Sequence, residues 1–112
     1  MVPGTRNNEM KYNLGKGAPR TTNEQGGMQA DTGLRFDLLD PRAMFELAAR
    51  MAYGAKKYAP DNWRKISWRE HAGHCIAHLY AAMAGMEDDD HIAGAFARAM
   101  MVTATYLTSK AS

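Results

Sequence analysis

Residues 67–107 read SWREHAGHCIAHLYAAMAGMEDDDHIAGAFARAMMVTATYL, and the expected architecture follows from this segment. Ser67 is a good helix N-cap, and Glu70 three residues later completes a capping box, so a helix is predicted from Ser67 to about Gly85. A following helix is predicted from about His91 to Leu107, since it is apolar over most of its circumference. We expect this last helix to be the most buried element.

Two stripes run along the predicted helix that begins at Ser67. One is apolar and is expected to face a core; it consists of Ala72, Ile76, Leu79, Met83 and Met86. The other is polar, with His71, His74 and His78 aligned at spacings of three and four residues. Cys75 adjoins this polar stripe and is expected to be a small core residue.

An earlier helix is predicted to start after Asp40, which suits the N-cap, with Pro41 in the first helical position. One face is apolar, and the opposite face gathers Glu46, Arg50, Tyr53 and Lys57. That second face is either a solvated surface with a Glu46–Arg50 pair or part of a binding site. The connection from Ala59 to Ser67 has the composition of a turn and carries Trp63, either as a core plug or as a ligand contact.

Residues 1–33 are rich in Gly, Asn, Thr and Gln and show no sustained period, so they are predicted to form an N-terminal arm. The arm carries a few large apolar residues, which allow it to stay flexible or to dock on the body or on a neighbouring subunit; they are Met10, Tyr12, Leu14 and Met28. Residues 34–112 are then predicted to form one all-α domain, a small helical bundle with short connections.

Size and composition favour an oligomer. The chain has 112 residues, of which 46% are hydrophobic and nine are methionine. A domain of this size buries only about 60 to 65% of the surface of its unfolded chain. We therefore expect a homo-oligomer, a dimer or a tetramer, to complete the bundle.

Several classes of function are disfavoured by charge and motif content. The formal net charge is +2, without a basic block, which argues against a nucleic-acid or membrane partner. The chain has one cysteine and no secretory or membrane-spanning pattern, so a cytoplasmic location is expected. Neither a P-loop nor a GxGxxG pattern occurs.

Histidines and acids are concentrated in one short interval. All four histidines lie between His71 and His91, and the four consecutive acids from Glu87 to Asp90 fall inside the same interval. A helix, a tight connection and a second helix bring such groups together, as in metal sites of helical bundles. Oxygen ligands suit Mg²⁺ or Mn²⁺, which we favour, whereas imidazole shifts the preference toward Mn²⁺, Co²⁺ or Zn²⁺. The alternative is a solvated acidic loop that stabilises the next helix N-terminus.

Beyond these patterns, the chain from Gly33 onward resembles a known family. The order of RFDLLDP, YGAKKY, Asn62 with Trp63, a histidine before leucine, an acidic pair and a final histidine is similar to the dATP/dGTP diphosphohydrolase domain. That domain belongs to the MazG- and HisE-like all-α pyrophosphohydrolases and includes MazZ-like proteins of viral nucleotide metabolism. The resemblance covers about residues 33–107.

The resemblance implies cleavage of a purine deoxynucleoside triphosphate, dGTP or dATP, into the monophosphate and pyrophosphate, with two or more Mg²⁺ or Mn²⁺ ions. For a viral protein, the location would be the cytoplasm of the host cell. The metal ligands that it implies are Glu46, His78, Glu87, Asp90 and His91. Catalytic roles fall to Glu46, Glu87 and Asp90. The substrate-binding set is Arg50, Lys57, Tyr58, Asn62 and Trp63.

The chain departs from the family pattern in two places. His74 and His78 stand where an acidic pair is typical, and Gly94 replaces a second histidine three residues after His91. The choice of ligands among Glu87, Asp88, Asp89 and Asp90 therefore stays open. Two other functions also stay open: a pyrophosphohydrolase that acts on another nucleotide, and a helical metal-binding or oligomerisation module without catalysis.

Overall fold

The computed structural model describes residues 12–111. The chain divides into two compact units, Met1–Leu39 and Asp40–Ser112. Within these described residues, no helix combines the length and the hydropathy that are needed to cross a bilayer. The predicted role of residues 34–112 as the catalytic domain stays a prediction.

The first unit contains a small hairpin that the sequence analysis did not predict. Strands β1 (Arg20–Thr22) and β2 (Met28–Ala30) pair antiparallel, with Arg20 opposite Ala30. The Asn23 side chain organises the turn, because its Oδ1 accepts hydrogen bonds from the amides of Gln25 at 3.0 Å and Gly27 at 2.8 Å. Such short, exposed strands carry no apolar alternation that would reveal them in the sequence.

After β2, a short connection leads to the 3-10 helix η1 (Phe36–Leu38). Leu14 and Met28, two of the apolar residues of the predicted arm, are exposed. Met10 lies outside the described residues.

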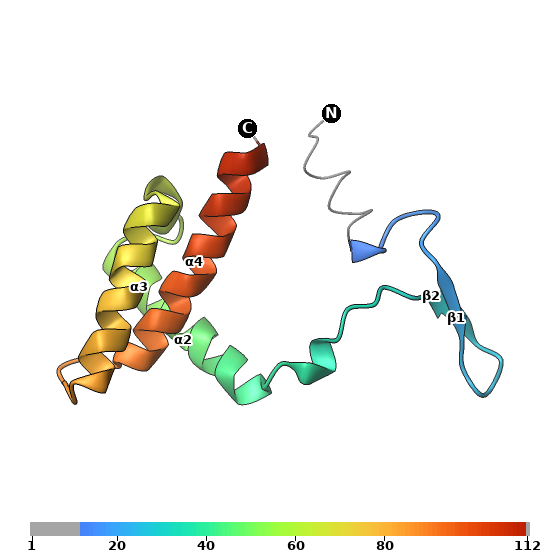
Figure 1. Cartoon of the computed structure of the whole chain (residues 1–112), viewed down its shortest axis with the longest axis horizontal. Coiled ribbons are helices and arrows are strands. Elements are labelled where there is room, and N and C mark those ends of the chain that lie inside the picture. The colour runs from blue at the N-terminus through green and yellow to red at the C-terminus, as the bar shows by residue number, and fades with distance from the viewer. Residues whose placement is uncertain (1–11, 112) are drawn as a thin grey trace. The chain divides into compact units, whose positions relative to one another are not determined.

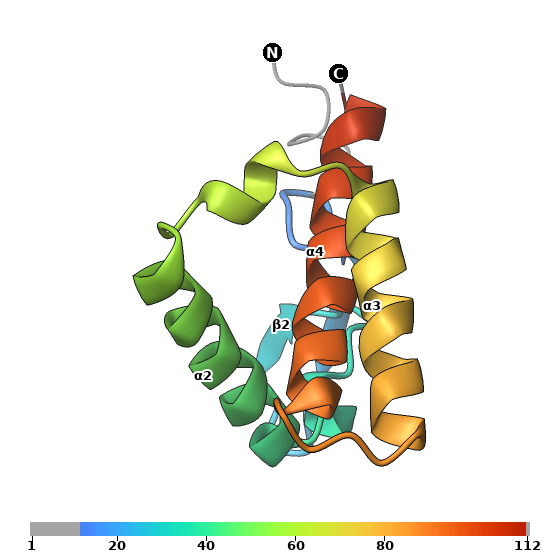
Figure 2. The ribbon, with the colours of Figure 1, turned by 90° about the vertical axis from the view of Figure 1, so that its left-hand side faces the viewer.

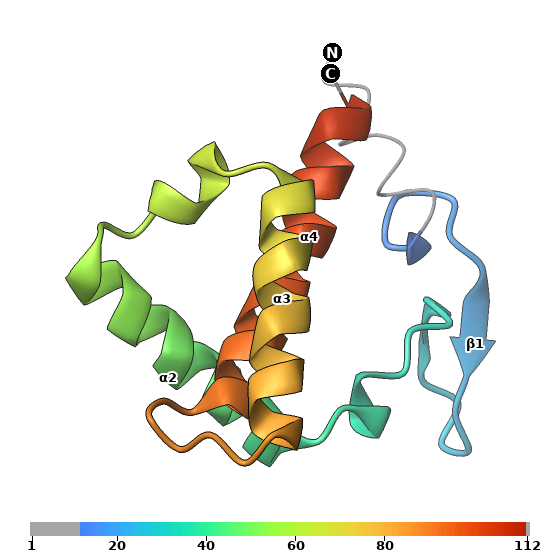
Figure 3. The ribbon, with the colours of Figure 1, turned by 60° about the vertical axis from the view of Figure 1, so that its left-hand side comes forward.

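The second unit confirms the predicted all-α class. Its elements follow in the order α2 (Pro41–Lys57), the 3-10 helix η2 (Asn62–Lys65), α3 (Trp68–Met83) and α4 (His91–Ala111). Figure 1 shows α3 and α4 side by side. Figure 3 shows the short connection that contains the four acids joining adjacent ends of these two helices.

Both predicted helix starts are confirmed at the level of hydrogen bonds. Asp40 Oδ1 accepts from the amide of Arg42 at 2.8 Å, and Pro41 is the first residue of α2. Ser67 Oγ accepts from the amide of Glu70 at 3.2 Å, while the Glu70 carboxylate accepts from the amide of Ser67 at the same distance. These side chains satisfy amides that the first helical turn leaves without partners.

Small residues on α4 form the contact with α3. Ala93, Gly94, Ala95 and Ala97 are buried, so α4 is the most buried of the described elements, as predicted. Their short side chains let the backbones approach: the Cys75 thiol on α3 donates to the Ala95 carbonyl at 3.3 Å. The face of α3 that meets them carries His71, which is fully buried, and His78.

The prediction that the apolar stripe of α3 faces the core of the chain is wrong. Ile76 is 54% exposed and Met83 is 81% exposed, and Leu79 and Met86 are exposed as well. His71 and His78 of the polar stripe face α4 instead, because small residues at the contact positions leave room for imidazole rings, whereas His74 is exposed. An apolar stripe on a helix predicts a face that avoids water, but it does not predict which other element contacts that face.

Helix α2 packs loosely within the chain. None of its residues is buried, and Phe45 and Tyr53 are exposed. Figure 2 shows α2 diverging from α4 toward its C-terminal end, where the connection that contains η2 leads back to α3. The interior of the second unit is therefore small: Ala93, Ala95 and Ala97 are the buried apolar residues among those described.

The capping box gives a first prediction. Ser67→Ala removes the acceptor for the Glu70 amide, so the free energy of unfolding should fall by about 1 kcal/mol, as for other N-cap substitutions. Urea denaturation at one fixed protein concentration measures this loss. The control is Thr103→Ala, since the Thr103 hydroxyl donates to the Ala99 carbonyl in the middle of α4. An equal loss in both variants would contradict the capping role.

Candidate active site

A recess of about 470 Å³ lies between α2, the following connection, α3 and α4. Its volume falls within the range of small-molecule sites in proteins. Three kinds of side chain with chemical roles line it: the cations Arg50, Lys57 and Arg98, the aromatic residues Tyr53, Tyr58 and Trp63, and the polar residues Asn62, His74, His78 and Asp89. The recess thus offers positive charge, ring faces and metal-ligating groups together.

Every residue expected to bind substrate lines this recess: Arg50, and the motif residues Lys57, Tyr58, Asn62 and Trp63. The polar face of α2 therefore borders the recess, rather than bulk solvent alone. Glu46 lies on the same face but lines a shallower adjoining recess of about 280 Å³, together with Arg50, Tyr53, Asp89 and Asp90. The two recesses share Arg50, Tyr53 and Asp89.

Arg50 pairs with Asp89, and not with Glu46 as the solvated-face interpretation had it. Its two terminal nitrogens each donate to one carboxylate oxygen of Asp89, both at 2.8 Å. The Arg50 side chain is 19% exposed, so this bidentate pair is partly shielded from water. The Arg50 guanidinium holds the pKa of Asp89 well below its usual range. The pair also connects α2 to the acidic connection.

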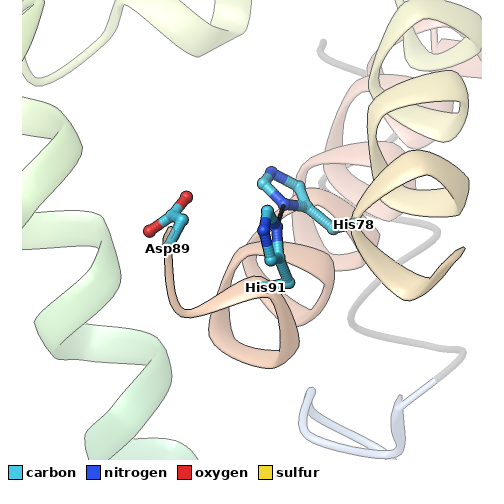
Figure 4. A group of neighbouring side chains, drawn as sticks. All are labelled: His78, Asp89 and His91. Carbon is cyan, nitrogen blue, oxygen red and sulfur yellow. Dashed lines mark hydrogen bonds between the residues drawn. The ribbon is translucent and has the colours of Figure 1, made fainter. Parts of the chain in front are cut away.

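Two histidines and Asp89 form a cluster at one end of the larger recess. His78 on α3, Asp89 in the acidic connection and His91 at the start of α4 offer ligand atoms that all lie within 4.8 Å of one another. Figure 4 shows the two rings in contact and the Asp89 carboxylate on the side of them that is nearer α2. The two Nδ1 atoms are 2.9 Å apart, within hydrogen-bonding distance.

Asp88 fixes the orientation of His91. A carboxylate only accepts, so the Nε2–H of His91 donates to Asp88 Oδ1 at 2.8 Å, and Nδ1 of the same ring faces His78. Burial, and then the charge of Arg50, lower the pKa of His78, which favours its neutral form. A carboxylate behind an imidazole is the usual support of a metal-binding histidine.

The cluster therefore fits a divalent cation. Two imidazole nitrogens and one carboxylate oxygen suit Mn²⁺, Co²⁺ or Zn²⁺ better than Mg²⁺. The Arg50 guanidinium already holds both oxygens of Asp89, so a bound cation would share Asp89 with Arg50 or replace it.

The structure does not bring all the predicted acids to the cluster. Asp90 Oδ1 accepts from the Ala93 amide at 3.0 Å and thus caps α4, and the residue lines the shallow recess beside Glu46. Glu87 is exposed and lines neither recess. Asp89 is the acid that lies beside His78 and His91, and its carboxylate is held there by Arg50.

Gly94 makes room for the cluster. A Cβ at this position would lie 2.9 Å from both Cε1 and Nε2 of His78. The glycine that replaces the family's second histidine thus allows the His78 ring to pack directly on the α4 backbone. From the sequence, Gly94 was interpreted only as a missing metal ligand. Its contact with His78 could not be predicted, because it depends on how α3 and α4 pack together.

Sequence reasoning missed Arg98, although one signal was available. It is the only charged residue between Ile92 and Ser109, in an otherwise apolar helix. Arg98 lines the recess, and its Nη1 lies 3.0 Å from Nδ1 of His71. His71 is not among the residues that line the recess, and its Nε2 contacts the Trp63 carbonyl at 2.8 Å.

The Gly94 contact gives a second prediction. Gly94→Ala should displace the His78 ring and lower the free energy of unfolding by about 1 to 3 kcal/mol, as overpacking does. Gly73→Ala on α3 is the matched control: nothing lies within 4 Å of its added Cβ. That variant should gain stability, by about 0.5 to 1 kcal/mol. Thermal and urea denaturation measure both, and a stabilised Gly94→Ala would contradict the contact.

Comparison with known proteins identifies the family. A family model described as dATP/dGTP diphosphohydrolase, N-terminal, matches residues 23–111. Neither the curated proteins nor the solved structures gave a match. The matched region includes every residue of both recesses, and the resemblance noted from the sequence is confirmed. Since the match spans most of the sequence, the chain belongs to the dATP/dGTP diphosphohydrolase family, in which it matches the N-terminal domain.

Proposed function

We propose that this protein hydrolyses a purine deoxynucleoside triphosphate, dATP or dGTP, to the monophosphate and pyrophosphate with the help of divalent cations. The observation that carries the proposal is the composition of the larger recess. One cavity joins three cationic side chains, an aromatic wall, and His78 with Asp89, which form a cluster with the neighbouring His91. These are the groups that a triphosphate, a purine base and a metal ion require.

Each part of the substrate has a counterpart in the recess. The ring faces of Tyr53, Tyr58 and Trp63 suit a planar base, and Asn62 offers an amide that can bind its edge or the sugar. Lys57 adds a positive charge for the phosphates and lies 5.2 Å above the Tyr58 ring. The phosphates then lie toward the histidine and aspartate cluster.

For the first cation, we propose His78, Asp89 and His91 as ligands, and Mn²⁺ as the ion that fits this set best. Glu46 and Asp90 line the adjoining recess and are proposed as ligands of a further ion. Cations held there would supply the positive charge that polarises the α-phosphate and activates the attacking water.

In the reaction, the water oxygen forms a bond to the α-phosphorus. The bond from the α-phosphorus to the oxygen that bridges to the β-phosphorus breaks, and pyrophosphate leaves with that oxygen. A carboxylate takes the proton of the water. Glu46 is our candidate, through the oxygen that does not hold the ion, because Asp89 is held by Arg50 and Asp90 accepts the Ala93 amide.

The third prediction tests this activity. With Mn²⁺, the protein should release pyrophosphate from dATP or dGTP, and more slowly from dCTP and dTTP. Asp89→Asn should lower kcat/KM by about 100-fold or more, since changes even to the partners of metal ligands cost 10- to 100-fold. The control is Asp61→Asn, because Asp61 is an exposed acid that pairs with Arg64.

The outcomes separate the open alternatives. Release from pyrimidine nucleotides alone would indicate another substrate. No release from any of the four would contradict catalysis and favour a metal-binding module. A loss in Glu87→Gln that equals the loss in Asp89→Asn would support the ligand assignment made from sequence.

We further propose that a second copy of this chain covers the exposed apolar stripe of α3, which consists of Ile76, Leu79 and Met83. Among the described residues, the buried apolar side chains are three alanines, which is too small a core for a domain of this size. A copy of the same chain is present at the same concentration, and symmetric pairing makes a stripe complementary to itself.

The fourth prediction concerns this assembly. Light scattering coupled to size exclusion should give a mass of two or four chains. Ile76→Glu should lower that mass or unfold the protein, because it places a charge on the covered stripe. Arg69→Glu changes the charge of the same helix at an exposed position and should keep the assembly. A wild-type mass of one chain would overturn the proposal.

A further inference from the structure

Arg98 lies in an unusual position for a guanidinium. It is half-buried on α4, lines the larger recess, and is bonded to a neutral ring nitrogen, Nδ1 of His71, at 3.0 Å. Among residues 12–111, no carboxylate pairs with it. The other two cations of the recess are placed differently: Arg50 is held by Asp89, and Lys57 lies over Tyr58.

His71 fixes the direction of this guanidinium. The ring is fully buried, and since a carbonyl only accepts, its Nε2–H donates to the Trp63 carbonyl at 2.8 Å. The lone pair of the neutral ring is then on Nδ1, where it accepts from Nη1 of Arg98. Burial lowers the pKa of His71, which keeps the ring neutral. One buried imidazole thus connects Trp63 to Arg98.

A half-buried charge without a counter-charge is costly for a protein to keep. Burial lowers the pKa of Arg98, which expresses the same cost. An apolar side chain of similar length would fill this place without that penalty. The arrangement is explained if an anion in the recess pairs with the guanidinium.

We propose that Arg98 binds a phosphate group of the polyphosphate chain, and that His71 is the residue that positions it. The nucleotide nature of the anion rests on the proposed function, whereas the anion site itself rests on Arg98 and its surroundings. Arg98 lies about one helical turn after Gly94 on α4, and Gly94 is the residue in contact with His78. This places it beside the departing pyrophosphate portion, with small residues at 94 and 97 leaving access along α4.

The first test uses inorganic pyrophosphate as the probe. Isothermal titration calorimetry is done on the full chain in a buffer with EDTA, so that no metal contributes. Arg98→Met should raise the Kd for pyrophosphate by about tenfold or more, the effect of losing one charged hydrogen bond. Arg98→Lys should bind between Arg98→Met and the wild type, since lysine keeps the charge but loses the planar fork.

Arg69→Met is the matched control, because Arg69 is an exposed cation on α3 that lies over Trp68 and lines no part of the recess. Its Kd should stay close to that of the wild type. Circular dichroism and thermal unfolding should show Arg98→Met folded, because the loss of the donor to the buried Nδ1 of His71 is offset by removal of a charge without a counter-charge. An unchanged Kd in folded Arg98→Met would overturn the proposal.

A pair of variants tests the positioning role of His71. In His71→Asn, the amide oxygen stands near the place of Nδ1 and can still accept from Arg98. In His71→Gln, the longer amide reaches toward the Trp63 carbonyl, in the place of Nε2, and leaves Arg98 without its acceptor. The Kd should therefore rise more in His71→Gln than in His71→Asn. If the Kd rises equally in both variants, in step with their loss of stability, His71 has only a structural role. That result would overturn the positioning role.

Turnover separates this inference from the proposed function. If the wild type hydrolyses dATP or dGTP, Arg98→Met should raise KM and lower kcat; unchanged values would overturn the inference and leave the function intact. If the wild type binds pyrophosphate through Arg98 but hydrolyses no nucleotide, the function fails and the anion site stands. A wild type that binds no pyrophosphate would overturn the inference.

Discussion

The close approach of α3 and α4 is the constraint on which the rest of the second unit depends. Gly94 and Ala95 project so little from α4 that α3 can approach closely and turn His71 and His78 toward it. With that face inward, His71 meets Arg98 and His78 meets His91. Larger residues at these positions would fill the space that the imidazole rings occupy.

The acidic connection and α2 are organised by the same contact. Because α3 and α4 lie side by side, the chain between them must turn tightly, and Asp88 and Asp89 point in different directions. Asp88 supports His91, and Asp89 reaches Arg50 on α2. The Arg50–Asp89 pair therefore links the helix that carries Tyr53 and Lys57 to the histidine cluster, so a change in the cluster bears directly on that helix.

The parts of the fold that were predictable from sequence are those determined by local chemistry. Asp40 with Pro41, and Ser67 with Glu70, mark helix starts because a side chain and a nearby amide suffice to form each cap. Arg50, Tyr53 and Lys57 of α2 were predicted to share one face, and they line one recess, since a single helix fixes their common face. Asp89 and Arg98 required knowledge of which helices pair, and no spacing within one helix reports that. The inward face of α3 was mistaken for the same reason: its imidazoles are accommodated by the small residues of another element.

The exposed apolar stripe of α3 has a consequence for how the protein behaves when it is diluted. Among residues 12–111 the buried apolar side chains are three alanines, so one molecule holds little of its folding free energy alone. If a second copy covers the stripe, as proposed, mass action governs the native state: the melting temperature would rise with concentration, and dilution would act as a mild denaturant.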